Sequence, residues 1–181
     1  APPIPPKKVK KPLVVIDPGH GGVDPGAIGA NKKFEKHIVL ALAKELKKKL
    51  EETGEYRVMM TRDDDRFIKL SDRVKFARQY EADLFVSIHA DSLERPNVRG
   101  ASVYTLSEKA SDAQTEKLAA QENRADLIAG VDLSVEDEEV ANILVDLAMR
   151  DTMNQSKFFA GKLVDTFRAG SLNVLDSPHR H

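Results

Sequence analysis

The sequence predicts an α/β fold: a mostly parallel, twisted sheet flanked by helices on both faces, with a helical insertion. Three observations predict it. The run at 13–16 is continuously apolar, as in a strand covered on both faces. Strand-like and helix-like stretches then alternate, which implies parallel strands joined by right-handed crossovers. From Ser107 onward the chain turns helical and acidic.

Four strands are predicted, at 13–16, 56–62, 82–91 and 100–106. In sheets of this kind, functional sites form beyond the C-terminal ends of the strands. His20 lies just past the first strand, and His89 lies at the end of the third.

Two helices are predicted between these strands. The first has apolar residues at every fourth position, with Val39 and Ala43 widening the stripe, and we expect Gly54 to end it. The second covers 70–80, with Ser71 as a candidate N-cap. The every-fourth-residue stripe of the first helix is Ile38, Leu42, Leu46 and Leu50.

The later part of the chain has helical spacing over 111–129 and an apolar stripe over 143–167, which fits either one bent helix or two. Between them Gly130 interrupts the pattern, and Ser134 with Asp137 resembles a capping box.

Composition excludes several classes of function. The net charge of -1, from 28 basic and 29 acidic residues, does not favour nucleic acid as a partner. The absence of cysteine excludes disulfides and thiolate catalysis, so any metal must be held by His, Asp or Glu. No apolar run is long enough for a membrane span.

One domain is expected from a length of 181 residues. Residues 1–12 contain five prolines and four lysines, which predicts an extended interdomain linker. Residues 13–181 are then the domain itself, with a helical segment inserted at about 107–156.

Three residues are candidate metal ligands: His20, Glu35 and His89. Two histidines and one glutamate form one of the standard ligand sets of catalytic zinc. Each residue also has a simpler interpretation. His20 could be a turn histidine satisfied by solvent, and Glu35 could be a carboxylate that favours a helix N-terminus.

Strand alternation places Ser87, His89 and Asp91 on one side of the third strand. Asp91 is therefore a candidate additional ligand or ligand-orienting residue, or alternatively a cap of the following turn. His37 points elsewhere on the first helix, and His179 and His181 occupy the chain end, where disorder is the default.

Four motifs in order resemble the zinc-dependent N-acetylmuramoyl-L-alanine amidases of bacterial cell-wall hydrolysis. They are "VVIDPGHGGVDPGAIG", the glutamate Glu35 at the start of the next helix, "TRDDDRFIKLSDRVKFA" and "LFVSIHAD". The resemblance implies that zinc is the cofactor, with His20, Glu35 and His89 as ligands. It also implies that zinc activates water to attack the amide bond between N-acetylmuramic acid and L-alanine in peptidoglycan.

The family's general base is a glutamate in a C-terminal "PSVLVE-x-G" strand, which this chain does not contain. The resemblance therefore implies a C-terminally incomplete domain, without the closing C-terminal strands, that binds zinc but hydrolyses poorly.

The segment from Ser107 to about Ser156 resembles the insertion of Gram-negative cell-division amidases. There, a helix occludes the zinc cleft until a LytM-type activator protein withdraws it. Glu122 is the candidate autoinhibitory metal contact, with a solvated helix face as the alternative. Activator docking is expected on an apolar stripe, which could instead be ordinary core: Val140, Ile143, Leu144 and Leu147.

The resemblance implies a periplasmic, monomeric enzyme of cell separation. One alternative is a catalytically silent, zinc-dependent peptidoglycan-binding or regulatory module, which the missing glutamate supports. The other is another zinc peptidase built on the same kind of sheet.

Overall fold

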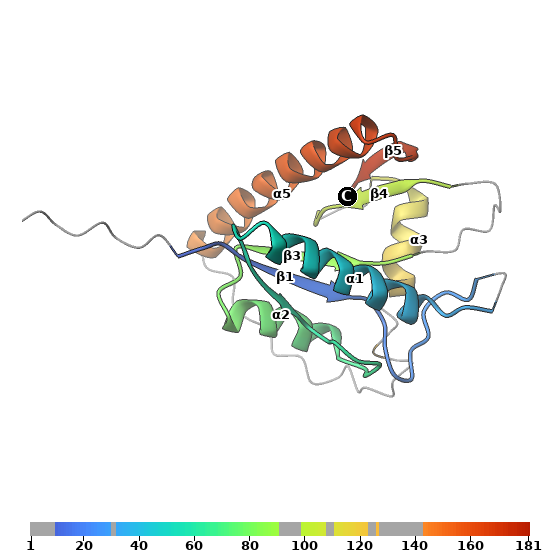
Figure 1. Cartoon of the computed structure of the whole chain (residues 1–181). Helices are drawn as coiled ribbons and strands as arrows, with labels where there is room; N and C mark the ends of the chain where they lie inside the picture. The colour runs from blue at the N-terminus through green and yellow to red at the C-terminus, as the bar shows by residue number, and fades with distance from the viewer. Residues whose placement is uncertain (1–9, 30–31, 91–98, 108–110, 123–125, 127–142) are drawn as a thin grey trace, which may run out of the picture. The chain divides into compact units, whose positions relative to one another are not determined.

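The computed structural model describes residues 10–29, 32–90, 99–107, 111–122, 126 and 143–181 (Figure 1). The chain forms two compact units. The first comprises Ala1–Ser92 with Ala125–Val131, and the second comprises Leu93–Arg124 with Asp132–His181.

The first unit contains a three-stranded parallel sheet in the order β2-β1-β3. Strand β1 (Leu13–Pro18) pairs with β2 (Arg57–Met60) on one side and with β3 (Leu84–Ile88) on the other. The last residue of β1 is in register with the last residue of β3, so the two strands end at the same edge. The predicted parallel sheet is confirmed.

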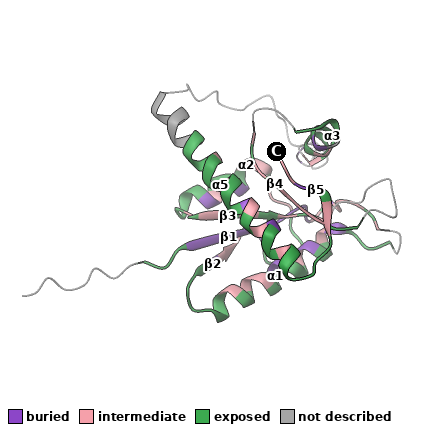
Figure 2. Cartoon of the chain, turned by 90° about the horizontal axis from the view of Figure 1, so that it is seen from above, coloured by how far each residue is buried: buried purple, intermediate pink, exposed green. Residues whose placement is uncertain are grey.

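Helices α1 (Glu35–Glu52) and α2 (Leu70–Gln79) cover opposite faces of this sheet (Figure 1). The side chains of β1 alternate between the faces. Ile16 packs in a cluster with Ala43 of α1, whereas Val15 packs in a second cluster with Ala77 of α2. β1 is therefore buried along its whole length, as Figure 2 shows, which explains the continuous apolar run at 13–16.

Two residues of the apolar stripe predicted for α1, Ile38 and Leu42, lie outside its buried face. Val39 and Ala43 are fully buried, whereas Ile38 and Leu42 are 40% and 52% exposed. Four residues turn an α-helix by about 400°, so a strict four-residue spacing drifts around the helix. The residues that are buried or pack on the sheet cluster follow a mixed spacing of four, three and four: Val39, Ala43, Leu46 and Leu50. As predicted, the helix ends just before Gly54, which has φ 70°.

The predicted N-cap of α2 is wrong. The helix begins at Leu70, so Ser71 lies inside its first turn, and no side chain at the N-cap position Lys69 makes a capping hydrogen bond. The carboxylate of Asp126 takes this role from a distant part of the chain, because Leu70 N donates to Asp126 Oδ1 at 3.0 Å. Asp126 is 4% exposed.

The second unit contains a two-stranded parallel sheet formed by β4 (Ala101–Tyr104) and β5 (Val174–Arg180). Helix α3 (Ala113–Glu122) follows β4. Helix α5 (Ile143–Ala169) packs against β4 and β5, and it is one continuous helix of 27 residues. Strand β5 was not predicted, because its polar sequence at the chain end suggested disorder.

Gly130, the Ser134–Asp137 box and Val140 lie outside the described residues, and the structure describes no side chain between 143 and 149. Within the described part of the chain, no helix is both long enough and apolar enough to cross a bilayer.

Candidate metal centre

The loop after β1 carries His20 in an unusual backbone conformation. His20 has φ 58°, in the left-handed region that non-glycine residues rarely adopt. The surrounding glycines allow close approach to the imidazoles: a Cβ on Gly19 would lie 2.4 Å from His89 Cε1, and one on Gly26 would lie 2.6 Å from His20 Cδ2. These glycines are therefore needed for the packing of the two rings.

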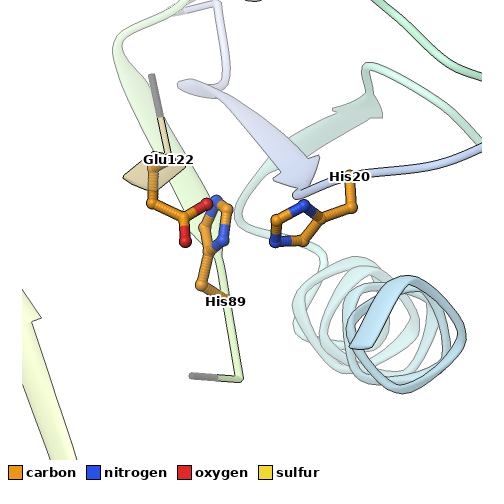
Figure 3. Close-up of side chains that lie close together, drawn as sticks. All are labelled: His20, His89 and Glu122. Carbon is orange, nitrogen blue, oxygen red and sulfur yellow. The ribbon is translucent and has the colours of Figure 1, made fainter. Parts of the chain in front are cut away.

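The carboxylate of Glu35 meets both histidines. Its Oε2 lies 3.2 Å from His20 Nε2, and its Oε1 lies 3.3 Å from His89 Nδ1. The two rings are in edge contact, with centroids 4.9 Å apart, and a ring nitrogen of each lies within 4.8 Å of one from the other (Figure 3). The structure thus brings together the three residues that the sequence analysis grouped.

Glu35 is buried, with 2% exposure, and its oxygens accept two backbone hydrogen bonds. Ala27 N donates to Oε2 at 2.9 Å, and Ala90 N donates to Oε1 at 2.6 Å. Burial alone would raise the pKa of Glu35, but the hydrogen bonds from the two histidines and the two amides outweigh it and hold the pKa well below its usual range. Glu35 is therefore an anion facing two imidazoles.

Asp24 orients the ring of His20, a role that the sequence analysis missed. Asp24 Oδ2 lies 2.8 Å from His20 Nδ1, and both side chains are buried. Burial lowers the pKa of His20, but hydrogen bonds to Glu35 and Asp24 and their charges raise it above the ordinary value overall. A proton on Nδ1 directed at Asp24 leaves Nε2, which faces Glu35 and His89, as the nitrogen that binds a metal when the ring is neutral. The sequence feature that could have indicated this role is an aspartate four residues after the histidine.

A second buried network lies beside the loop. Asp17 is 4% exposed and accepts hydrogen bonds from Thr61 Oγ1 at 2.6 Å, from Ser87 Oγ at 2.7 Å and from a guanidinium nitrogen of Arg73 at 2.9 Å. Arg62 is fully buried nearby. The two arginines were not singled out from the sequence, because their acceptors are mostly carbonyl groups.

Asp91 lies outside the described residues, so its role stays a prediction. Glu122 is the half-buried last residue of α3, in the second unit, and its contact with metal also stays a prediction. As expected, His37 belongs to a different cluster, where its Nε2 lies 3.6 Å from Asp65 Oδ2. In the second unit, His179 Nε2 is hydrogen-bonded to Thr105 Oγ1 at 3.1 Å.

The donor set fits zinc. Two imidazoles and one carboxylate converge, the carboxylate is ionised, and a carboxylate fixes the tautomer of one imidazole. Three protein ligands of this kind leave a fourth tetrahedral position for water or substrate, as in catalytic zinc sites.

Comparison with known proteins identifies relatives of the chain. A family model described as N-acetylmuramoyl-L-alanine amidase matches residues 14–155. N-acetylmuramoyl-L-alanine amidase AmiA of Escherichia coli strain K12 is 47% identical over 147 residues, covering 81% of this chain and 50% of the relative. AmiC of Neisseria meningitidis serogroup B is 44% identical over 156 residues, covering 86% of this chain and 37% of the relative.

Among solved structures, N-acetylmuramoyl-L-alanine amidase AmiC2 of Nostoc punctiforme is similar, with a TM-score of 0.51 and 45% identity over 53% of each chain. The chain thus spans about half the length of the curated AmiA that it matches.

Proposed function

The chain belongs to the N-acetylmuramoyl-L-alanine amidase family, and from that premise we propose that it is the zinc-bearing part of an enzyme acting on peptidoglycan. The bond cleaved is the amide between N-acetylmuramic acid and L-alanine. The observation that carries the proposal is the convergence of the ionised Glu35 carboxylate with His20 and His89.

We assign the zinc ligands to His20, Glu35 and His89. When bound, zinc supplies a Lewis acid that polarises the scissile carbonyl and lowers the pKa of a water molecule. The protein holds the ligands in place: Asp24 keeps a proton on Nδ1 of His20, and the amides of Ala27 and Ala90 hold the carboxylate of Glu35.

We further propose that the insertion at about 107–156 inhibits the enzyme and that a LytM-type activator relieves the inhibition. Glu122 is the residue that would take the open position on zinc. The support is a hydrogen bond that Leu70 N donates to Asp126. Asp126 follows Glu122 by four residues, so this bond ties the insertion to the metal-bearing unit at a point close in sequence to the proposed plug. The activator would act by withdrawing this segment.

The setting that we propose is cell separation in the periplasm, because the relatives are N-acetylmuramoyl-L-alanine amidases by name and the bond that this name describes lies in peptidoglycan. The enzyme would act as a monomer on glycan strands that carry stem peptides.

Metal content and reaction products test the proposed function. The chain should retain about one zinc after dialysis. His20→Ala and His89→Ala should each weaken zinc binding at least tenfold, whereas His37→Ala, a histidine outside the cluster, should bind like the wild type. Zinc binding that survives both cluster substitutions would contradict the ligand assignment.

The reaction is tested with the whole protein that contains this chain. Digestion of muropeptides should release intact stem peptides from the glycan, whereas a shortened stem would indicate a peptidase instead. For inhibition, Glu122→Ala should raise the basal rate and Glu116→Ala, an exposed glutamate of the same helix, should leave it unchanged. Equal rates for the wild type and Glu122→Ala would rule out the plug.

A further inference from the structure

Three consecutive carbonyl groups of the loop that carries His20 accept hydrogen bonds from two buried arginines. The Pro18 oxygen accepts from Arg62 Nε at 3.0 Å and from an Arg73 nitrogen at 2.8 Å. The Gly19 oxygen accepts from Arg62 at 2.6 Å, and the His20 oxygen accepts from Arg73 at 2.9 Å. The backbone from the end of β1 to the histidine is thus bound to guanidinium groups at every residue.

The remaining donors of each guanidinium bind neighbouring segments. Arg62 also donates to the oxygen of Lys36, in the first turn of α1, at 3.1 Å, and to that of Asp64 at 3.0 Å. Arg73 also donates to the oxygen of Ile68 at 2.9 Å and forms a buried ion pair with Asp17 at 2.9 Å. The two side chains therefore tie the loop to the start of α1 and to the start of α2.

Two buried guanidiniums in one place are costly. Arg62 is 0% exposed and Arg73 is 3% exposed, and burial followed by the charge of Arg73 lowers the pKa of Arg62. Among the described residues, Asp17 is the one carboxylate that forms an ion pair with either guanidinium group, and its partner is Arg73. An arrangement that served stability alone would gain as much or more from apolar side chains at these positions.

We propose that Arg62 and Arg73 are positioning residues for the metal centre. By binding the carbonyls of residues 18–20 they hold His20 in its left-handed conformation, so that Nε2 faces Glu35 and His89. Left-handed φ values cost free energy for a side chain other than glycine and persist only where the surroundings enforce them. This inference rests on the proposed zinc site.

Arginine is required because its planar fork reaches two carbonyls at once. Arg73 binds the oxygens of Pro18 and His20 through neighbouring nitrogens, and Arg62 binds those of Pro18 and Gly19 in the same way. A lysine keeps the positive charge but offers one compact ammonium group, so it cannot hold both acceptors in that geometry.

The test compares Arg73→Lys and Arg62→Lys with Arg78→Lys, an exposed arginine in the last turn of α2. Zinc affinity is measured by competition with a chromophoric chelator, and the visible absorption of the cobalt-substituted protein reports the geometry at the metal. Both buried-site variants should bind zinc about 10- to 100-fold more weakly, as for other residues that orient metal ligands, and should shift the cobalt bands. Arg78→Lys should match the wild type in both measurements.

Val58→Ala separates positioning from general stability. Val58 is buried in β2 and does not touch the loop carbonyls, so its truncation should lower the melting temperature while leaving zinc affinity and the cobalt spectrum unchanged. If Arg73→Lys does not fold, Arg62→Lys provides the same comparison through Pro18 and Gly19.

Two outcomes are distinguishable. Wild-type binding and spectra in folded Arg73→Lys and Arg62→Lys would overturn the positioning role while leaving the zinc site intact. A wild-type chain that binds neither zinc nor cobalt would overturn the proposed function itself, and with it this inference.

Discussion

Nδ1 of His20 lies 2.8 Å from Oδ2 of Asp24, and both side chains are buried. The carboxylate therefore decides which nitrogen of the imidazole carries the proton and which is left to bind metal. Residues in this position raise the basicity of a metal-binding histidine and fix the direction of its ring.

Asp24→Asn should weaken zinc binding about 10- to 100-fold, because the amide removes the negative charge that favours a proton on Nδ1. Chelator competition measures the affinity. Asp83→Asn is the matched control: Asp83 also accepts a backbone hydrogen bond, from Leu13 N at 2.7 Å, but at the opposite end of β1. Equal affinities for Asp24→Asn and the control would show that Asp24 does not act through the metal ligand.

Val39→Ala should lower the free energy of unfolding by about 2 kcal/mol, because Val39 is fully buried. Ile38→Ala, one position earlier on the exposed side of α1, should change it by less than about 0.5 kcal/mol. Urea denaturation monitored by circular dichroism gives both values. A larger loss of stability for Ile38→Ala than for Val39→Ala would instead support the buried stripe expected from the four-residue spacing.

Asp65 makes the stability of the loop depend on pH. It accepts hydrogen bonds from Lys36 Nζ at 2.7 Å and from Gly22 N at 2.8 Å. The hydrogen bond from Lys36 lowers its pKa, exposure limits the opposing effect of burial, and the Gly22 amide lowers the pKa further.

Because the folded-state pKa lies below the unfolded value, the stabilisation by Asp65 is complete above about pH 4 and is lost as the pH falls through the folded pKa. Asp65→Asn should therefore be less stable than the wild type at pH 7, and the difference should shrink as the pH falls through the folded-state pKa of Asp65. Thermal melts across this range measure the difference, and a constant difference would exclude an ionised Asp65 as its source.

Asp126→Ala should destabilise the first unit by about 1 kcal/mol, the usual effect of losing a helix cap, because Leu70 N then loses its acceptor. Asp126→Asn retains an acceptor oxygen and should restore most of this stability. In the whole protein, the alanine variant should also have a higher basal amidase rate, and the asparagine variant should not. If Asp126→Ala lost stability without a higher basal amidase rate, the helix cap would have no part in the proposed inhibition.

Local patterns predicted the parts of the fold whose causes are local. The apolar run of β1, the helix beginning at Glu35 and the strand before His89 follow from periodicity within a few residues, and parallel strands that end at one edge bring these positions together. That is why three candidate ligands could be grouped before their contacts were known.

Non-local contacts explain what was missed. Ser71 has the residue type of a cap, but Asp126 caps the helix from 56 positions away. Arg62 and Arg73 bind carbonyl oxygens, which every residue has and which therefore leave no mark in the sequence. Strand β5 is polar, and its pairing with β4 depends on a partner about seventy residues earlier in the chain.

The common end of β1 and β3 has a consequence for the order in which the protein opens. His20 and His89 follow adjacent strands but are far apart in the chain, so an ion bound to both would close a large loop, much as a disulfide does. β2 has no such tie. β2 and β3 are the two edge strands of the described three-stranded sheet, so removing the ion should loosen β3 before β2, and amide hydrogen exchange would resolve the two edges separately.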